Sequence, residues 1–115
     1  METINSKQIE FKETPGENET VYTWTKDNEE IAKVIAKNPN SNYPRIEFLI
    51  VESLIPYYEE DKKSALDEIG EMSMYSEMES RTEDGYVHGK MKCSHNASLG
   101  VGNLVQSIKG WVSKS

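Results

Sequence analysis

Three side chains that can bind a metal or act in catalysis lie close together near the end of the chain: His88, Cys93 and His95. A zinc site needs at least three converging ligands, and a structural site usually takes four. On an extended strand Cys93 and His95 share one face and His88 points to the other, so we expect no metal. Residues 85–115 contain no Asp or Glu that could orient a Cys93–His95 pair. We therefore expect no covalent catalysis, and a buried Cys93 that packs as a small apolar group.

A run with two glycines, Gly100-Val101-Gly102, follows a predicted strand and opens a predicted helix. Backbone N–H groups at a helix N-terminus can bind an anion, and Lys90 and Lys92 precede the run. These four residues could hold a phosphate or the pyrophosphate of a coenzyme. An anion- or coenzyme-binding domain is therefore the alternative interpretation of the chain. We favour the structural interpretation, in which the glycines let a helix pack closely on a sheet, and we expect no cofactor.

Acidic residues are concentrated in the middle of the chain. The formal net charge is −7, and residues 59–84 hold ten acids against three bases, whereas residues 85–115 hold four bases and no acid. One interpretation is a solvated acidic helix that a neighbouring basic strand partly neutralises. The other is a partner-binding surface, since clustered charge of one sign steers association. The residues predicted to make that surface are Glu59, Glu60, Asp61, Asp67, Glu68 and Glu71.

The composition narrows the class of protein. An acidic balance argues against direct binding of nucleic acid, because phosphate contacts are made mostly by Lys and Arg. No apolar run approaches the roughly 20 residues that cross a bilayer, and residues 1–7 lack the pattern of a signal peptide. With a single cysteine, these features favour a cytoplasmic protein without disulfides that does not act at a membrane.

We therefore expect a small acidic binding module that acts as a non-enzymatic protein inhibitor. It would occlude a basic, for example nucleic-acid-binding, surface of a protein partner, as viral anti-defence proteins and toxin-immunity proteins do. The alternatives are the anion-binding domain described above and a structural component of an assembly. The identity of the partner and the oligomeric state stay open.

The first half of the chain predicts a hairpin followed by helices. Residues 8–12 alternate apolar and polar side chains, and residues 21–25 are β-branched or aromatic, so both segments are typical of strands. Asp27 can cap a helix that carries Ile31, Val34 and Ile35 and ends before Pro39. Residues 45–55 suit either a helix or a buried strand, and we favour the helix.

The second half predicts a long helix, a strand and a final helix. Residues 61–81 suit a helix of about twenty residues, and residues 86–94 alternate between an apolar and a basic face. The segment from Ser98 has the widest apolar stripe, typical of an amphipathic C-terminal helix. The fold class predicted is α+β: one domain over residues 1–115, with frayed ends at 1–6 and 113–115. In it, three to four helices cover a small antiparallel sheet of three to four strands.

Overall fold

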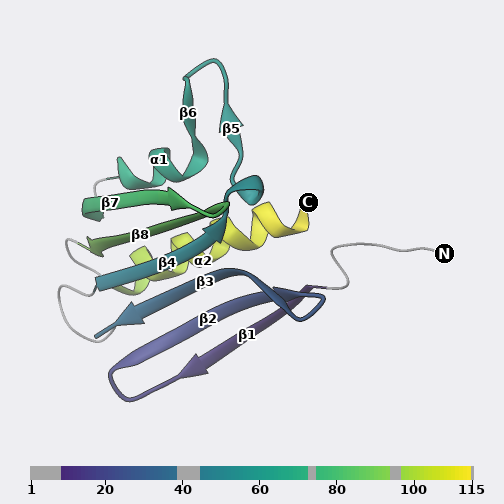
Figure 1. The fold of residues 1–115 in the computed structure, drawn as a ribbon. Helices are drawn as coiled ribbons and strands as arrows, with labels where there is room; N and C mark the ends of the chain where they lie inside the picture. Colours follow the sequence, from purple (N-terminus) through teal and green to yellow (C-terminus); the bar gives the residue numbers. More distant parts are fainter. Residues whose placement is uncertain (1–8, 39–44, 73–74, 94–96, 115) are drawn as a thin grey trace.

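A computed structural model describes residues 9–38, 45–72, 75–93 and 97–114 (Figure 1). Within these ranges the chain forms a six-stranded antiparallel sheet in the order β1-β2-β3-β4-β8-β7, a two-stranded hairpin β5–β6, and two α-helices. The elements are β1 (Ile9–Pro15), β2 (Glu19–Lys26), β3 (Glu29–Lys37), β4 (Arg45–Val51), the 3-10 helix η2 (Glu52–Leu54), β5 (Tyr57–Tyr58), β6 (Lys63–Ser64), α1 (Ala65–Gly70), β7 (Tyr75–Glu83), β8 (Tyr86–Cys93) and α2 (Ala97–Ser113).

This architecture shows that the predicted fold class is wrong. The described residues are mostly β, with eight strands and two α-helices, in place of three to four helices over three to four strands. Some individual elements agree with the prediction: the N-terminal hairpin is β1 and β2, the strand predicted over residues 86–94 is β8, and the C-terminal helix is α2. The errors lie between residues 27 and 81.

Strand β3 stands where a helix was predicted from Asp27. Asp27 and Asn28 have φ angles of 53° and 66°, and they form the two-residue turn between β2 and β3. Such a turn needs the left-handed region at both positions, which Asp and Asn tolerate better than most residues. Past the turn, Ala32, Val34 and Ala36 are buried at every second position, so the chain continues as a strand.

Residues 45–55 form strand β4 and the short η2, so the favoured helix is wrong here too. The buried side chains are Ile46, Phe48 and Ile50, while Glu47 and Leu49 between them lie on the other face. β4 pairs along its length with β3 on one side and β8 on the other. A strand with neighbours on both sides has its backbone groups paired, which explains how so apolar a segment is buried.

The helix predicted over residues 61–81 is divided into β6, α1 and β7. Helix α1 begins at a capping box: Ser64 Oγ accepts from the Asp67 N–H at 3.1 Å, and the Asp67 carboxylate accepts from the Ser64 N–H at 3.3 Å. The helix thus begins after Ser64 and not at residue 61. After α1 the chain forms β7, an edge strand whose side chains are mostly exposed and polar, which is why it shows little apolar alternation.

Helix α2 packs across one face of the sheet and forms the core with it (Figure 1). Leu104 and Ile108 are fully buried, as the apolar stripe predicts. Burying a large apolar side chain stabilises a fold by about 1.5–3 kcal/mol, so this stripe is a main source of stability. Helix α1 adds Ala65, Leu66 and Ile69 to the same core. We call the opposite side of the sheet the open face; it carries Lys33, Glu47, Leu49, His88 and Lys90.

Candidate functional site

The β5–β6 hairpin carries half of the predicted acidic surface and stands away from the sheet (Figure 1). Tyr57 pairs with Ser64 and Tyr58 with Lys63, and residues 59–62 form the tip. The Lys62 N–H donates to the Glu59 carbonyl at 3.3 Å, and Lys62 has a φ of 54°, so the tip is a closed turn. Every side chain from residue 57 to residue 62 is exposed.

The base of the hairpin is joined to the core. Leu54 and Ile55, just before it, pack against the core cluster while partly buried. The Ala65 N–H, just after it, donates to the Pro56 carbonyl at 2.8 Å, and the Ala65 side chain is buried. A hairpin of two residues per strand has no core of its own, so these contacts hold it in place.

Besides its acids, the hairpin carries two exposed tyrosines. Tyr57 is 59% exposed and Tyr58 is 40% exposed, which places both among the few large apolar side chains that the described structure leaves in solvent. Tyrosine is enriched among the residues that dominate protein–protein binding energies. Tyr57 and Tyr58 are not among the residues predicted from the sequence to bind a partner. The signal available was two adjacent aromatic residues between a proline and three acids, outside any apolar pattern.

The six predicted acidic residues lie on one continuous segment, the hairpin tip and α1, but they are not equivalent. Asp67 accepts the N-cap hydrogen bond described above. Glu71 pairs with Lys63 Nζ at 2.9 Å, and this hydrogen bond raises the pKa of Lys63. The charges of Asp61 and Glu68 raise that pKa further, so both carboxylates lie near Lys63.

The side chains of the remaining acids, Glu59, Glu60, Asp61 and Glu68, have no hydrogen bond or ion pair with a described residue. Together with Tyr57 and Tyr58 they form what we call the hairpin surface. Its four acids are the members of the predicted surface whose side chains are not already held by a hydrogen bond or an ion pair among the described residues.

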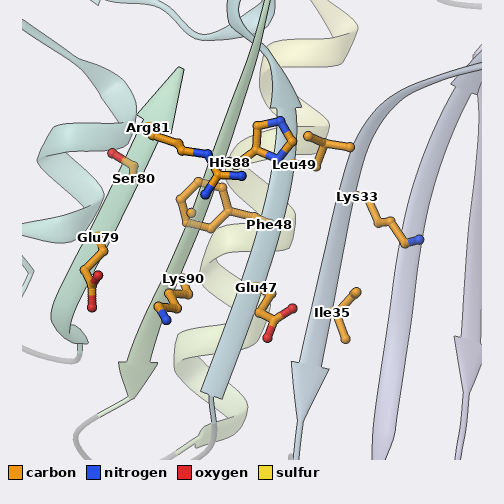
Figure 2. Close-up of a pocket in the computed structure, with 11 residues that line it drawn as sticks. Lys33, Ile35, Glu47, Phe48, Leu49, Glu79, Ser80, Arg81, His88 and Lys90 are labelled. Atoms are coloured by element: carbon orange, nitrogen blue, oxygen red, sulfur yellow. The ribbon is translucent and has the colours of Figure 1, made fainter. Parts of the chain in front are cut away.

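The open face holds a groove of about 530 Å³, shown in Figure 2. Its lining includes Lys33, Arg81 and Lys90, and also the acids Glu47 and Glu79. Beside it, Lys37 Nζ lies 2.6 Å from Glu47 Oε2. The volume would suit a small molecule. Because acids and bases are interspersed along the groove, however, it favours no charge class of ligand.

Cys93 is 1% exposed and lies beneath α2. Burial raises the pKa of its thiol, which keeps the sulfur protonated and unreactive near neutral pH. His88 lines the groove on the open face, whereas His95 lies outside the described residues. No group of three or more His, Cys, Asp or Glu side chains that could hold a metal occurs within the described ranges.

The structure does not bring the four candidate anion-binding residues together. Lys90 lines the open-face groove, and Lys92, two positions along β8, pairs with Glu77 at 2.8 Å. Gly100 and Gly102 belong to α2, on the other side of the sheet. A Cβ on Gly100 would lie 2.6 Å from Cys93 Sγ, so this glycine permits close packing of α2 on β8.

In structural terms the described chain is a β-rich domain: a six-stranded antiparallel sheet, one long helix behind it, and a projecting acidic hairpin (Figure 1). Comparison with protein-family models, with curated proteins and with solved structures finds no match. Among the described residues, neither helix has the length and apolar character needed to cross a membrane.

Proposed function

We propose that the protein is a small cytoplasmic, non-enzymatic inhibitor that binds a basic surface of another protein through its β5–β6 hairpin. One observation carries the proposal: the hairpin projects from the sheet with two exposed tyrosines beside three exposed acids at its tip. The acids supply attraction to Lys and Arg on the partner, and the tyrosines supply contact area. The partner class that fits this chemistry is a protein with a basic, for example nucleic-acid-binding, groove.

The arrangement of the tyrosines favours insertion into a groove over docking on a flat surface. Successive residues of a strand point to opposite faces, so Tyr57 and Tyr58 lie on opposite sides of the hairpin. A flat partner would cover only one of them, whereas a groove would contact both. With the hairpin seated, Glu59, Glu60 and Asp61 at the tip would reach the floor of that groove. The natural ligand of the groove would then be excluded.

The two components of the surface act on different rate constants. Exposed charges mainly speed association, and this effect weakens as salt rises. Aromatic side chains that become buried mainly slow dissociation. We therefore expect charge variants to lower the association rate and its salt dependence. Tyr57→Ala should instead raise the dissociation rate, about 10-fold or more for a contact worth above about 1.4 kcal/mol.

The test captures partners from lysate with the wild-type protein and then measures the captured partner against two matched variants. One reverses Glu59 and Glu60 to Lys; the other reverses Glu17 and Glu29, which are also exposed, lie outside β1 and the hairpin, and change the net charge by the same amount. Loss of binding by about 10-fold or more in the first variant alone would support the proposal. Equal losses of binding in both variants would show that binding depends only on the net charge of the protein, and would refute the proposal. Matching thermal melts confirm that each variant folds.

A further inference from the structure

The sheet ends in two edge strands that differ in how they are protected. In β7 the register with β8 shifts between Ser76 and Glu79, and Glu77 has a φ of 52°. Such a bulge disrupts the row of backbone groups that another strand would need. In β1 all seven residues pair with β2 without a register shift. β1 therefore presents a regular outer row of backbone donors and acceptors, the feature by which sheets join other strands.

An apolar ring is exposed on that same edge. The Phe11 side chain is 39% exposed. The centroid of its ring lies 5.0 Å from the centroid of the Trp24 ring, and Lys109 Nζ lies 4.4 Å from the centroid of the Phe11 ring. Because Phe11 pairs with the buried Trp24, it points to the core side of the sheet. Its neighbours Glu10 and Lys12 therefore point to the open face. The apolar layer of the core thus reaches the edge of the sheet and ends there in solvent.

We propose that β1 pairs with β1 of a second copy of this chain, antiparallel and across a two-fold axis through Phe11. Residues that lie opposite each other in an antiparallel pair point to the same face of the sheet. If the core faces of the two copies are to lie on the same side, the two-fold axis must therefore pass through a residue and not between two residues. An axis at Glu10 or Glu13 sets two acids against each other, and an axis at Lys12 sets two lysines against each other. Like charges directly opposite are destabilising. The axis at Phe11 instead places Glu10 opposite the partner's Lys12, and this pair occurs twice.

The register through Phe11 also brings together the two exposed aromatic rings of the paired strands. The two Phe11 rings meet at the axis, and aromatic pairs across strands are favourable. Ile9 faces the partner's Glu13, so the paired segment runs from residue 9 to residue 13. Pro15, which has no N–H to donate, falls outside it. Since the bulge disrupts β7, each chain has one regular edge, and the arrangement closes as a dimer.

This pairing is independent of the proposed inhibitory function. The β5–β6 hairpin is connected through α1 to the β7 side of the sheet, at the opposite edge from β1 (Figure 1). A dimer formed through β1 leaves both hairpin surfaces exposed. It would therefore present two of them to partners at once.

The experiment is sedimentation of the full chain at concentrations up to about 1 mM, since a short strand pairing predicts a weak dimer. Glu10→Lys and Lys12→Glu each place like charges opposite one another twice. Each should weaken dimerisation by roughly 30-fold, the effect of about 1 kcal/mol per pair. In the monomer these positions face Thr25 and Thr23, which are uncharged, so neither substitution sets like charges against each other within the chain.

Mixing the two single variants restores opposite charges at both contacts, so the mixture should dimerise although each variant alone does not. The double variant Glu10→Lys/Lys12→Glu should dimerise like the wild type. Glu17→Lys, the same charge change in the turn after β1, is the control and should leave the dimer unchanged. A wild-type chain that stays monomeric, or variants that fail to complement each other, would overturn the proposal. A species larger than a dimer would also overturn it.

Discussion

Gly100 and Gly102 lie two residues apart in α2, and the same substitution should act on them in opposite directions. A Cβ on Gly100 would lie 2.6 Å from Cys93 Sγ and 3.4 Å from Tyr75 Cε1, whereas one on Gly102 would meet nothing within 4 Å. Gly100→Ala therefore forces buried Cys93, or α2 itself, to move by about 1 Å from its packed position. Gly102→Ala adds a methyl group in open space.

The magnitudes follow from two opposing effects. Alanine is favoured over glycine inside a helix by about 1 kcal/mol, so Gly102→Ala should raise the free energy of unfolding by about 0.5–1 kcal/mol. Gly100→Ala gains the same amount but overpacks the core, which costs about 1–3 kcal/mol where side chains have no room to adjust. Cys93 is 1% exposed and has no such room. We expect a net loss of about 1 kcal/mol, hence a difference of about 2 kcal/mol between the two variants.

Urea unfolding of the two variants beside the wild type measures this difference directly. It corresponds to melting temperatures about 10 °C apart in a domain of this size. The double variant Gly100→Ala/Cys93→Ala removes the sulfur from the contact and should recover most of the loss. Gly110→Ala, where a Cβ would also meet nothing within 4 Å, is a second control and should stabilise. If Gly100→Ala stabilises the protein as much as Gly102→Ala does, the close contact between α2 and β8 is wrong.

Other changes have equally defined outcomes. Leu104→Ala should lower the free energy of unfolding by about 2–5 kcal/mol because Leu104 is fully buried, whereas Gln106→Ala, at an exposed position, should change it by under about 0.5 kcal/mol. Similar values for the two variants in urea unfolding would contradict the placement of Leu104 in the core. Burial, followed by the charge of nearby Cys93, raises the pKa of Tyr75 from 10.0 to about 12, so the unfolded chain loses this proton first. Stability should therefore fall as pH rises from about 10 to 12, and melts of Tyr75→Phe at stepped pH should show a smaller fall. Cys93→Ala should leave partner binding unchanged and cost about 1 kcal/mol of stability; lost binding in a folded variant would contradict a non-enzymatic role.

The elements that were predicted correctly have sequence patterns that fit only one type of secondary structure. In α2 the apolar residues recur every three or four positions from Val101 to Val112, about three turns, which no strand can bury on one face. In β8 polar and apolar residues alternate, because one side of that strand faces the core and the other faces solvent. The hairpin of β1 and β2 adds a turn sequence with proline and glycine between two strand-like segments.

The misassigned elements carry patterns that suit two structures. In β3, Ile31, Val34 and Ile35 form a helical stripe, but the alternation of Ala32, Val34 and Ala36 is equally present and is the one that the core uses. The tight turn at residues 27 and 28 decides between them, and an Asp there is as typical of a helix cap as of a turn. Edge strand β7 shows no clear pattern at all, because most of its side chains are exposed and polar, and the apolar alternation typical of a strand is therefore absent.

The candidate site was predictable in part. The charge count alone located the acidic segment, because it does not depend on secondary structure. Tyr57 and Tyr58 lie outside any periodic pattern, because two-residue strands are too short for a period to show. The sequence marks them only as two aromatic residues between a proline and three acids, which does not determine their exposure. This exposure depends on where the chain leaves the sheet after β4, which is set by the long-range pairing of β4 with β8.

That pairing also has a consequence for folding. All other neighbours in the main sheet are joined by short connections, whereas β4 and β8 meet only after residues 52–85 close into a loop. The strands β1–β4 form one part of the sheet by local pairing, and β7 and β8 form the other. The pairing of these two parts is therefore expected to be the slow step, because folding slows as contacts join residues farther apart in the sequence. The entropic cost of closing a flexible loop rises by only about 0.6 kcal/mol when its length doubles. Because the β5–β6 hairpin lies inside this loop, its length and sequence can vary at little cost to the sheet.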